Sequence, residues 1–164
     1  MQMTPRTLAP LLVLVASFGL VGSVGSSAAS AATSYADRVE SSVVSSTNHK
    51  RVQRGLRVVR GNACIDQMAE SWARHLAQAG TLVHRRLGRV LSRCDRSYVS
   101  ENLAKYPMSS GLTAAEIAQG TVNAWMRSDA HRHNLLSTKP RVIGLGVARS
   151  ANGRYWVIVQ NFAR

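Results

Sequence analysis

Hydrophobic positions in the first half of the chain recur at the spacing of amphipathic helices. A first helix is expected from about Val39 to just before Gly55, because glycine is suited to the left-handed conformation that ends many helices. A second helix is expected to start at Asn62 or Ala63 and to stop at Gly80. The residues that would share the buried faces of these helices are Val39, Val43, Val44 and Thr47, then Ile65, Met68, Ala69, Trp72 and Leu76.

A third helix is expected after the turn-rich break at residues 107–111. Thr113 followed three residues later by Glu116 has the spacing of a capping box, in which each side chain bonds the backbone of the other residue. The buried face of this helix would contain Ile117, Thr121, Val122 and Trp125. Its end leads to His131.

The period of the pattern changes from helical to alternating near the C-terminus. Ile143, Leu145 and Val147 alternate with the small residues Gly144, Gly146 and Ala148, which indicates a strand with one face closely approached by another element. The Asn152-Gly153 pair favours a hairpin, and residues 155–162 are rich in strand formers. Helices followed by a terminal hairpin predict an α+β fold or a sheet covered by helices.

The N-terminal segment has the composition of a secretory signal. Arg6 precedes an apolar run over residues 8–21, and Ala29-Ser30-Ala31 fits a small-x-small cleavage site. We therefore expect residues 1–31 to be a signal peptide and residues 32–42 to be a short linker or ragged start. An uncleaved N-terminal anchor is the alternative.

The net positive charge of the chain favours an acidic partner. Without residues 1–31 the chain has 20 Lys and Arg against 8 Asp and Glu, a net charge of +12, and 17 of the 20 bases are arginine. Arginine suits paired contacts with phosphate or carboxylate groups. For an exported protein we expect an anionic cell-wall polymer or lipid rather than a specific nucleic acid. The alternative is that the charge only keeps the protein soluble.

The two cysteines, Cys64 and Cys94, are expected to form a disulfide because the chain carries an export signal. Closing a loop of about 30 residues would stabilise the fold by roughly 3–4 kcal/mol. A metal site is not expected from this pair, since no Cys-x-x-Cys spacing is present.

Three residues in short polar islands are the candidates for chemistry: His84, Glu101 and His131. Two imidazoles and one carboxylate form a ligand set that suits Zn²⁺ with an open coordination position. Each residue also has a structural alternative. His84 could satisfy carbonyls at a helix end, Glu101 could cap a backbone, and His131 could simply be solvated, as we expect for His133.

Five segments, in order and at consistent spacings, resemble the CAP superfamily, the group of cysteine-rich secretory, antigen 5 and pathogenesis-related 1 proteins also called SCP domains. The matching segments are Asn48-x-x-Arg51-x-x-x-Gly55-Leu56, Ala69-x-x-Trp72-Ala73-x-x-Leu76-Ala77-x-x-Gly80 ending at His84, Ser100-Glu101-Asn102-Leu103-Ala104, Trp125-Met126-x-Ser128-x-x-His131-Arg132-x-Asn134-Leu135-Leu136, and Ile143-Gly144-Leu145-Gly146-Val147-Ala148.

This resemblance implies a CAP/SCP domain over residues 43–164. The implied fold is a three-layer α-β-α sandwich with a central, mainly antiparallel sheet, in which His84, Glu101 and His131 face one cleft. Three departures concern that cleft. Ser128 lies where many relatives have a second glutamate, Ser100 replaces the usual glycine, and Arg85-Arg86-Leu87 replaces a small polar run.

The resemblance supports a secreted binding module whose cleft holds zinc or another divalent metal and takes a lipid or cell-wall ligand. A second hypothesis is a metal-dependent, protease-like hydrolase in which Glu101 is the catalytic base. A third is a polyanion-binding surface protein with an inactive cleft. No nucleophile motif, phosphate loop or dinucleotide motif is present, so we expect no organic cofactor and favour binding over catalysis.

Overall fold

The computed structural model describes residues 34–108 and 111–164, and the expected signal peptide lies outside this range. Helices and strands are interspersed along the described chain, and the last two elements are strands. In chain order the elements are α1 (Tyr35–Val52), β1 (Arg60–Gly61), α2 (Ala63–Ala79), α3 (Gly88–Arg93), β2 (Val99–Pro107), α4 (Ala114–Arg127), α5 (Asp129–Leu136), β3 (Val142–Arg149) and β4 (Tyr155–Ala163).

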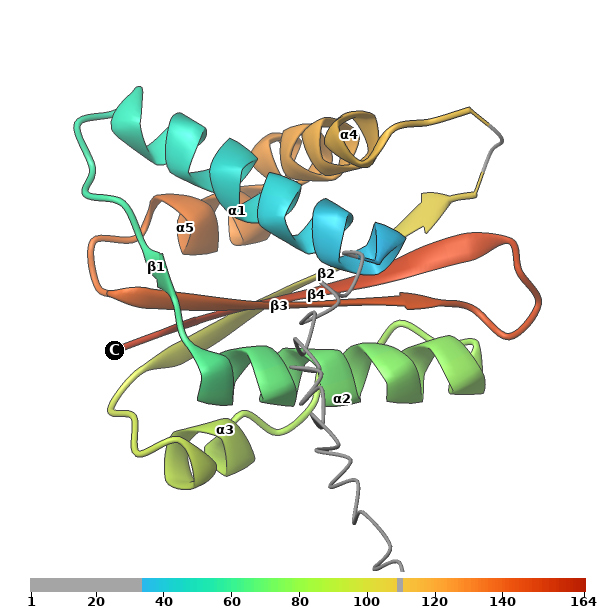
Figure 1. Ribbon diagram of the computed structural model, residues 1–164. Coiled ribbons are helices and arrows are strands. Elements are labelled where there is room, and N and C mark those ends of the chain that lie inside the picture. Colours follow the sequence, from blue (N-terminus) through green and yellow to red (C-terminus); the bar gives the residue numbers. More distant parts are fainter. Residues whose placement is uncertain (1–33, 109–110) are drawn as a thin grey trace, which may run out of the picture. The chain divides into compact units, whose positions relative to one another are not determined.

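The elements form three layers. The sheet has the order β1-β3-β4-β2, with α1, α4 and α5 on one face and α2 and α3 on the other (Figure 1). Strand β4 is antiparallel to both β2 and β3, and only the short β1 runs parallel to its neighbour β3. The predicted α+β sandwich with a mainly antiparallel sheet is confirmed.

Helix α1 begins earlier than the sequence analysis expected. The Ser34 hydroxyl accepts a hydrogen bond from the Asp37 backbone N–H (3.1 Å), and the Asp37 carboxylate accepts one from the Ser34 N–H (3.0 Å). This capping box fixes the helix start at Tyr35. The prediction of a linker over residues 32–42 is therefore wrong from Tyr35 onward, because the Ser34–Asp37 cap and the stacking of Tyr35 on Trp156 hold the first turn.

Helices α2 and α4 have the bounds and caps that the sequence predicts. Asn62 caps α2, Gly80 follows it in the left-handed conformation, and Thr113 and Glu116 form the expected capping box at α4. His131 does not lie at the end of α4, however. The extended backbone of Ser128 interrupts the helix, and His131 belongs to the separate helix α5. Strands β1 and β2 and helix α3 were not predicted.

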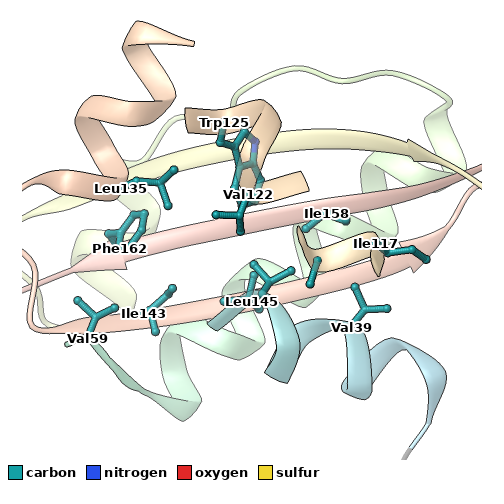
Figure 2. Packing of buried hydrophobic residues seen from close by; sticks show 12 residues of the cluster. Val39, Val59, Ile117, Val122, Trp125, Leu135, Ile143, Leu145, Ile158 and Phe162 are labelled. Atoms are coloured by element: carbon teal, nitrogen blue, oxygen red, sulfur yellow. The ribbon is translucent and has the colours of Figure 1, made fainter. Parts of the chain in front are cut away.

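The larger part of the core lies between the sheet and the layer of α1, α4 and α5 (Figure 2). Trp125 from α4 is 2% exposed, and its indole N–H donates to the Leu103 carbonyl of β2 (2.9 Å). On the other face α2 packs almost directly on β3. A Cβ added at Gly144 or Gly146 would overlap the α2 backbone, which explains the small residues in that strand.

Candidate functional site

His84 lies in the loop between α2 and α3 and contacts a buried carboxylate. Its Nδ1 is 2.9 Å from the Oε1 of Glu101 on β2. The His84 side chain is 58% exposed, whereas that of Glu101 is 1% exposed. One side of the imidazole is therefore fixed by the protein while the other faces solvent.

The second oxygen of the Glu101 carboxylate is also occupied. Oε2 accepts a hydrogen bond from the Asn161 side-chain amide (3.2 Å) and lies 3.2 Å from the Nε of Arg85. The Arg85 guanidinium also donates to the Met68 carbonyl (2.7 Å) and to the Asn161 side chain. Burial lowers the pKa of Arg85 even though Glu101 acts in the opposite direction. This arrangement neutralises and orients a carboxylate that would otherwise be costly to bury.

His131 approaches the same region from the other layer, on α5. It is partly buried, and its pKa is lowered first by desolvation and then by the charge of His84. The two imidazoles are thus within electrostatic range of each other. A lowered pKa favours the uncharged imidazole, which is the form that binds metals.

Side-chain amides behind the site join β2 to its neighbours. The Asn102 amide donates to the His131 carbonyl (3.3 Å) and to the Gln160 side chain (3.0 Å), while Asn134 donates to the Asn102 side chain (2.9 Å). Gln160 in turn donates to the Thr47 hydroxyl of α1 (3.0 Å). These contacts give Asn102 a structural role, because they join β2 to α5 and β4.

Four residues that build the site were not predicted to be part of it: Arg85, Asn134, Gln160 and Asn161. The polar pair Gln160-Asn161 inside an apolar strand was a usable signal, since opposite residues of antiparallel strands share a face. Asn161 lies opposite Glu101, and Gln160 lies opposite Asn102. Glu101 and Asn102 therefore act on opposite faces of the sheet.

The three predicted site residues are arranged unequally. The structure brings His84 and Glu101 into direct contact and places His131 within electrostatic range of His84. Among the described residues, no group of three or more His, Cys, Asp or Glu side chains is arranged to hold a metal ion. Glu101 has protein partners on both oxygens, so its role as a direct metal ligand remains a prediction.

The other candidate residues lie as follows. His49, His75 and His133 are exposed, and Trp72 is half-buried with its ring stacked on His75. The predicted disulfide is present: Cys64 at the start of α2 is bonded to Cys94 directly after α3.

Comparison with known families decides the identity of the domain. Residues 44–162 match the model of the CAP family, described as the cysteine-rich secretory protein family. The chain belongs to the CAP family. No curated protein matches the chain.

Solved structures share the CAP fold at low identity. An extracellular SCP-domain protein of Bacillus anthracis matches with a TM-score of 0.64 and 20% identity, over 79% of this chain and 41% of that one. An outer surface protein of Borrelia burgdorferi matches with a TM-score of 0.60 and 20% identity, over 74% of this chain and 89% of that one. NaASP2, solved with Zn²⁺, has a TM-score of 0.60 and 12% identity, over 78% and 80%.

These relatives include extracellular and surface proteins, and the chain spans less than half the length of the Bacillus protein. Within residues 34–108 and 111–164, no helix has the length and apolar character needed to cross a membrane.

Proposed function

We propose that this CAP-domain protein is a secreted binding module whose cleft holds a divalent metal, zinc above all, on His84 and His131. The hydrogen bond between His84 Nδ1 and Glu101 Oε1 carries the proposal. When Nδ1–H donates to a carboxylate, the lone pair of Nε2 is free for a metal and the ring is held in place. Glu101 then acts as the outer partner of a ligand.

The chemistry of the cleft fits an open, weak site. Two neutral imidazoles would hold the ion, and the remaining positions would be left to water or to a bound ligand, whereas closed structural zinc sites have four protein ligands. A bound metal would polarise an oxygen of such a ligand. Support also comes from NaASP2, a protein of the same fold that was solved with Zn²⁺.

Secretion is supported by three independent features. Residues 1–31 have the composition of a signal peptide, the disulfide suits an oxidising compartment, and the structural relatives include extracellular and surface proteins. A lipid or an anionic cell-wall polymer is the expected ligand class, since the chain is strongly basic.

Hydrolysis has less support. A general base needs a free oxygen close to the attacking water. Both oxygens of Glu101 are bonded, to His84 on one side and to Arg85 and Asn161 on the other. Catalysis by Glu101 would require these bonds to be released.

Calorimetric zinc titration tests the metal site. The His84→Ala/His131→Ala variant should lose zinc binding with little change in melting temperature, and Glu101→Gln should bind with a modest loss. Wild-type affinity should fall as the pH drops through about 6.5, because protonated imidazole cannot bind a metal. A His49→Ala/His133→Ala variant, which removes two exposed histidines, is the matched control. Equal zinc affinity in the wild type and the His84/His131 variant would contradict the site.

A further inference from the structure

A groove runs between α2 and the segment that follows His84. It consists of two adjoining hollows of about 500 and 560 Å³, which share Met68, Ser71 and Arg89 in their walls. One wall is the α2 face that carries Gln67, Met68, Ser71, Trp72 and His75. The other is the segment of residues 85–93. We call this feature the arginine groove.

The second wall of the groove is strongly basic and has few acidic partners. Arg85 is paired with Glu101, but Arg86, Arg89 and Arg93 are exposed and make no ion pair with any residue that the structure describes. None of the residues that line the two hollows is acidic. Arg89 and Arg93 lie four residues apart on α3, so they are neighbours and repel each other. Such a row of guanidinium groups is suited to a ligand with several negative charges.

The α2 wall adds an aromatic surface. The rings of Trp72 and His75 are stacked with centroids 4.7 Å apart and planes inclined by 16°, and the Arg85 guanidinium lies 5.9 Å from the Trp72 ring centroid. The Trp72 indole N–H has no hydrogen-bond partner among the described residues. An aromatic face beside cationic groups offers contact area to the apolar face of a ring while the arginines bind its charged substituents.

The segment of residues 85–93, here called the arginine segment, is held in place at both ends. Arg85 is fixed to Met68 and Glu101 at one end, and the Cys64–Cys94 disulfide ties the other end to the start of α2. Between them Val90 is fully buried against Ile65. The backbone of the groove is thus organised before a ligand arrives, which lowers the entropic cost of binding.

We infer that the arginine groove binds an extended acidic polysaccharide, with carboxylate or phosphate groups on the arginines and a sugar ring against Trp72 and His75. The inference rests on the proposed role as a binding module and names the chemistry of its polymer ligand. It does not depend on the metal. The ligand would lie along α2 and reach the cleft at His84, because Arg85 and Arg86 directly follow that residue.

Binding of the full chain to two defined polymers tests the groove. The probes are polygalacturonate, whose sugar rings carry carboxylates, and phosphomannan, whose sugar rings carry phosphates, each measured at about 0.05 and 0.15 M salt. Arg86→Gln/Arg89→Gln/Arg93→Gln should lower the affinity for at least one polymer by about tenfold or more at either salt concentration. If the triple variant loses more affinity for polygalacturonate, the arginines bind carboxylates. If it loses more affinity for the phosphate polymer, they bind phosphates.

The matched control is Arg54→Gln/Arg127→Gln/Arg154→Gln, which removes the same charge from exposed residues that line neither hollow. It should cost no more than about threefold. Equal losses in the two triple variants would overturn the groove, because net charge alone would then explain binding. His75→Ala should lower the affinity severalfold without changing the melting temperature, and unchanged affinity would overturn the sugar contact.

Two further measurements separate the alternatives. Tighter binding to single-stranded DNA or to phosphatidylglycerol vesicles than to either polysaccharide would overturn the proposed ligand class. The His84→Ala/His131→Ala variant should keep its polymer affinity while losing zinc. Loss of polymer binding in that variant would overturn the independence of the groove from the metal, whereas a chain that binds zinc but neither polymer would overturn the groove alone.

Discussion

The two sides of α2 face opposite charges: carboxylates of α2 and α1 lie toward β3, whereas arginines lie on the segment that leads into α3 and on α3 itself. Toward β3 the carboxylates accept hydrogen bonds from the strand backbone. Asp66 accepts the Leu145 N–H (3.0 Å), and Glu40 of α1 accepts the Val147 N–H (2.8 Å). Toward α3 the guanidinium groups of Arg86, Arg89 and Arg93 have no acidic partner in the described chain. The carboxylates toward β3 therefore stabilise the fold, whereas the arginines toward α3 are available to a ligand.

The reason for this difference lies in the sheet. Strand β1 pairs only with Val142 and Ile143, so among the described residues the outer edge of β3 has no neighbouring strand beyond that point. An unpaired edge invites association with other chains, and covering its N–H groups with carboxylates prevents this. The acids also repel one another. Burial, followed by the charges of Glu70, Asp37 and Asp66, raises the pKa of Glu40 to about 7 against the opposing bond from Val147.

Removing the disulfide should have the largest effect and should act on the groove side. Cys64→Ser/Cys94→Ser frees the end of the arginine segment and should lower the free energy of unfolding by about 2–4 kcal/mol. Hydrogen exchange should show lost protection in residues 88–94 and retained protection at Leu145 and Val147. Uniform loss over both sides of α2 would show that the two sides do not behave as separate regions.

A methyl group added at Gly146 should destabilise the packing of α2 on β3, on the opposite side from the groove. The Cβ of Gly146→Ala would overlap the backbone of Ala69 and Glu70, so α2 must move away from β3, at a cost of about 1–3 kcal/mol in a denaturant melt. Gly61→Ala is the matched control, because no atom lies within 4 Å of the added Cβ and the change should be small. Equal stabilities for the two variants would contradict the close approach of α2.

Glu40→Gln should change the way in which the stability of the β3 side depends on pH. The folded-state pKa of Glu40 is raised from 4.5 to about 7, so the contribution of the neutral carboxyl is fully present below about pH 4.5 and is lost as the pH rises through 7. Glutamine stays neutral and keeps an acceptor for Val147. The variant should gain about 1–2 kcal/mol over the wild type at pH 8 and little at pH 4.5.

The control for this substitution is Asp95→Asn, which removes one exposed negative charge at a residue with φ of 49°, a conformation that asparagine tolerates. Its melting temperature should differ from that of the wild type by a similar amount at pH 4.5 and pH 8. A Glu40→Gln variant with the same pH profile as the wild type would show that this carboxyl is already ionised at neutral pH.

The parts of the fold that the sequence predicted are those stabilised by local signals. Periodic apolar residues and caps defined α2 and α4, and Asn152-Gly153 with its flanking alternation defined the hairpin of β3 and β4. Strand β2 was missed because its Ser-Glu-Asn segment reads as a loop. The buried side chains of Glu101 and Asn102 have partners on β4 and α5, which are distant in sequence.

Helix α3 was missed for a related reason. Only Val90 is buried among the six residues of α3, so the helix has no amphipathic pattern that a sequence could reveal. Its position is fixed by the disulfide at Cys94, directly after the helix. In the site, the polar islands located His84, Glu101 and His131, but the partners of Glu101 could not be assigned. The contact of Arg85 with Asn161 joins residues 76 positions apart, and no local pattern encodes it.

The amide network behind the cleft determines how the site can respond to acid. Asn102, Asn134, Gln160 and Thr47 carry no group that titrates between pH 4 and 9, and together they join β2 to α1, α5 and β4. A change of charge on the imidazoles of the site therefore leaves the hydrogen bonds of this network unchanged. Under the proposed function, acid release of the metal would leave this network intact, so the site would bind the metal again when the pH returns to neutral without first rebuilding its scaffold.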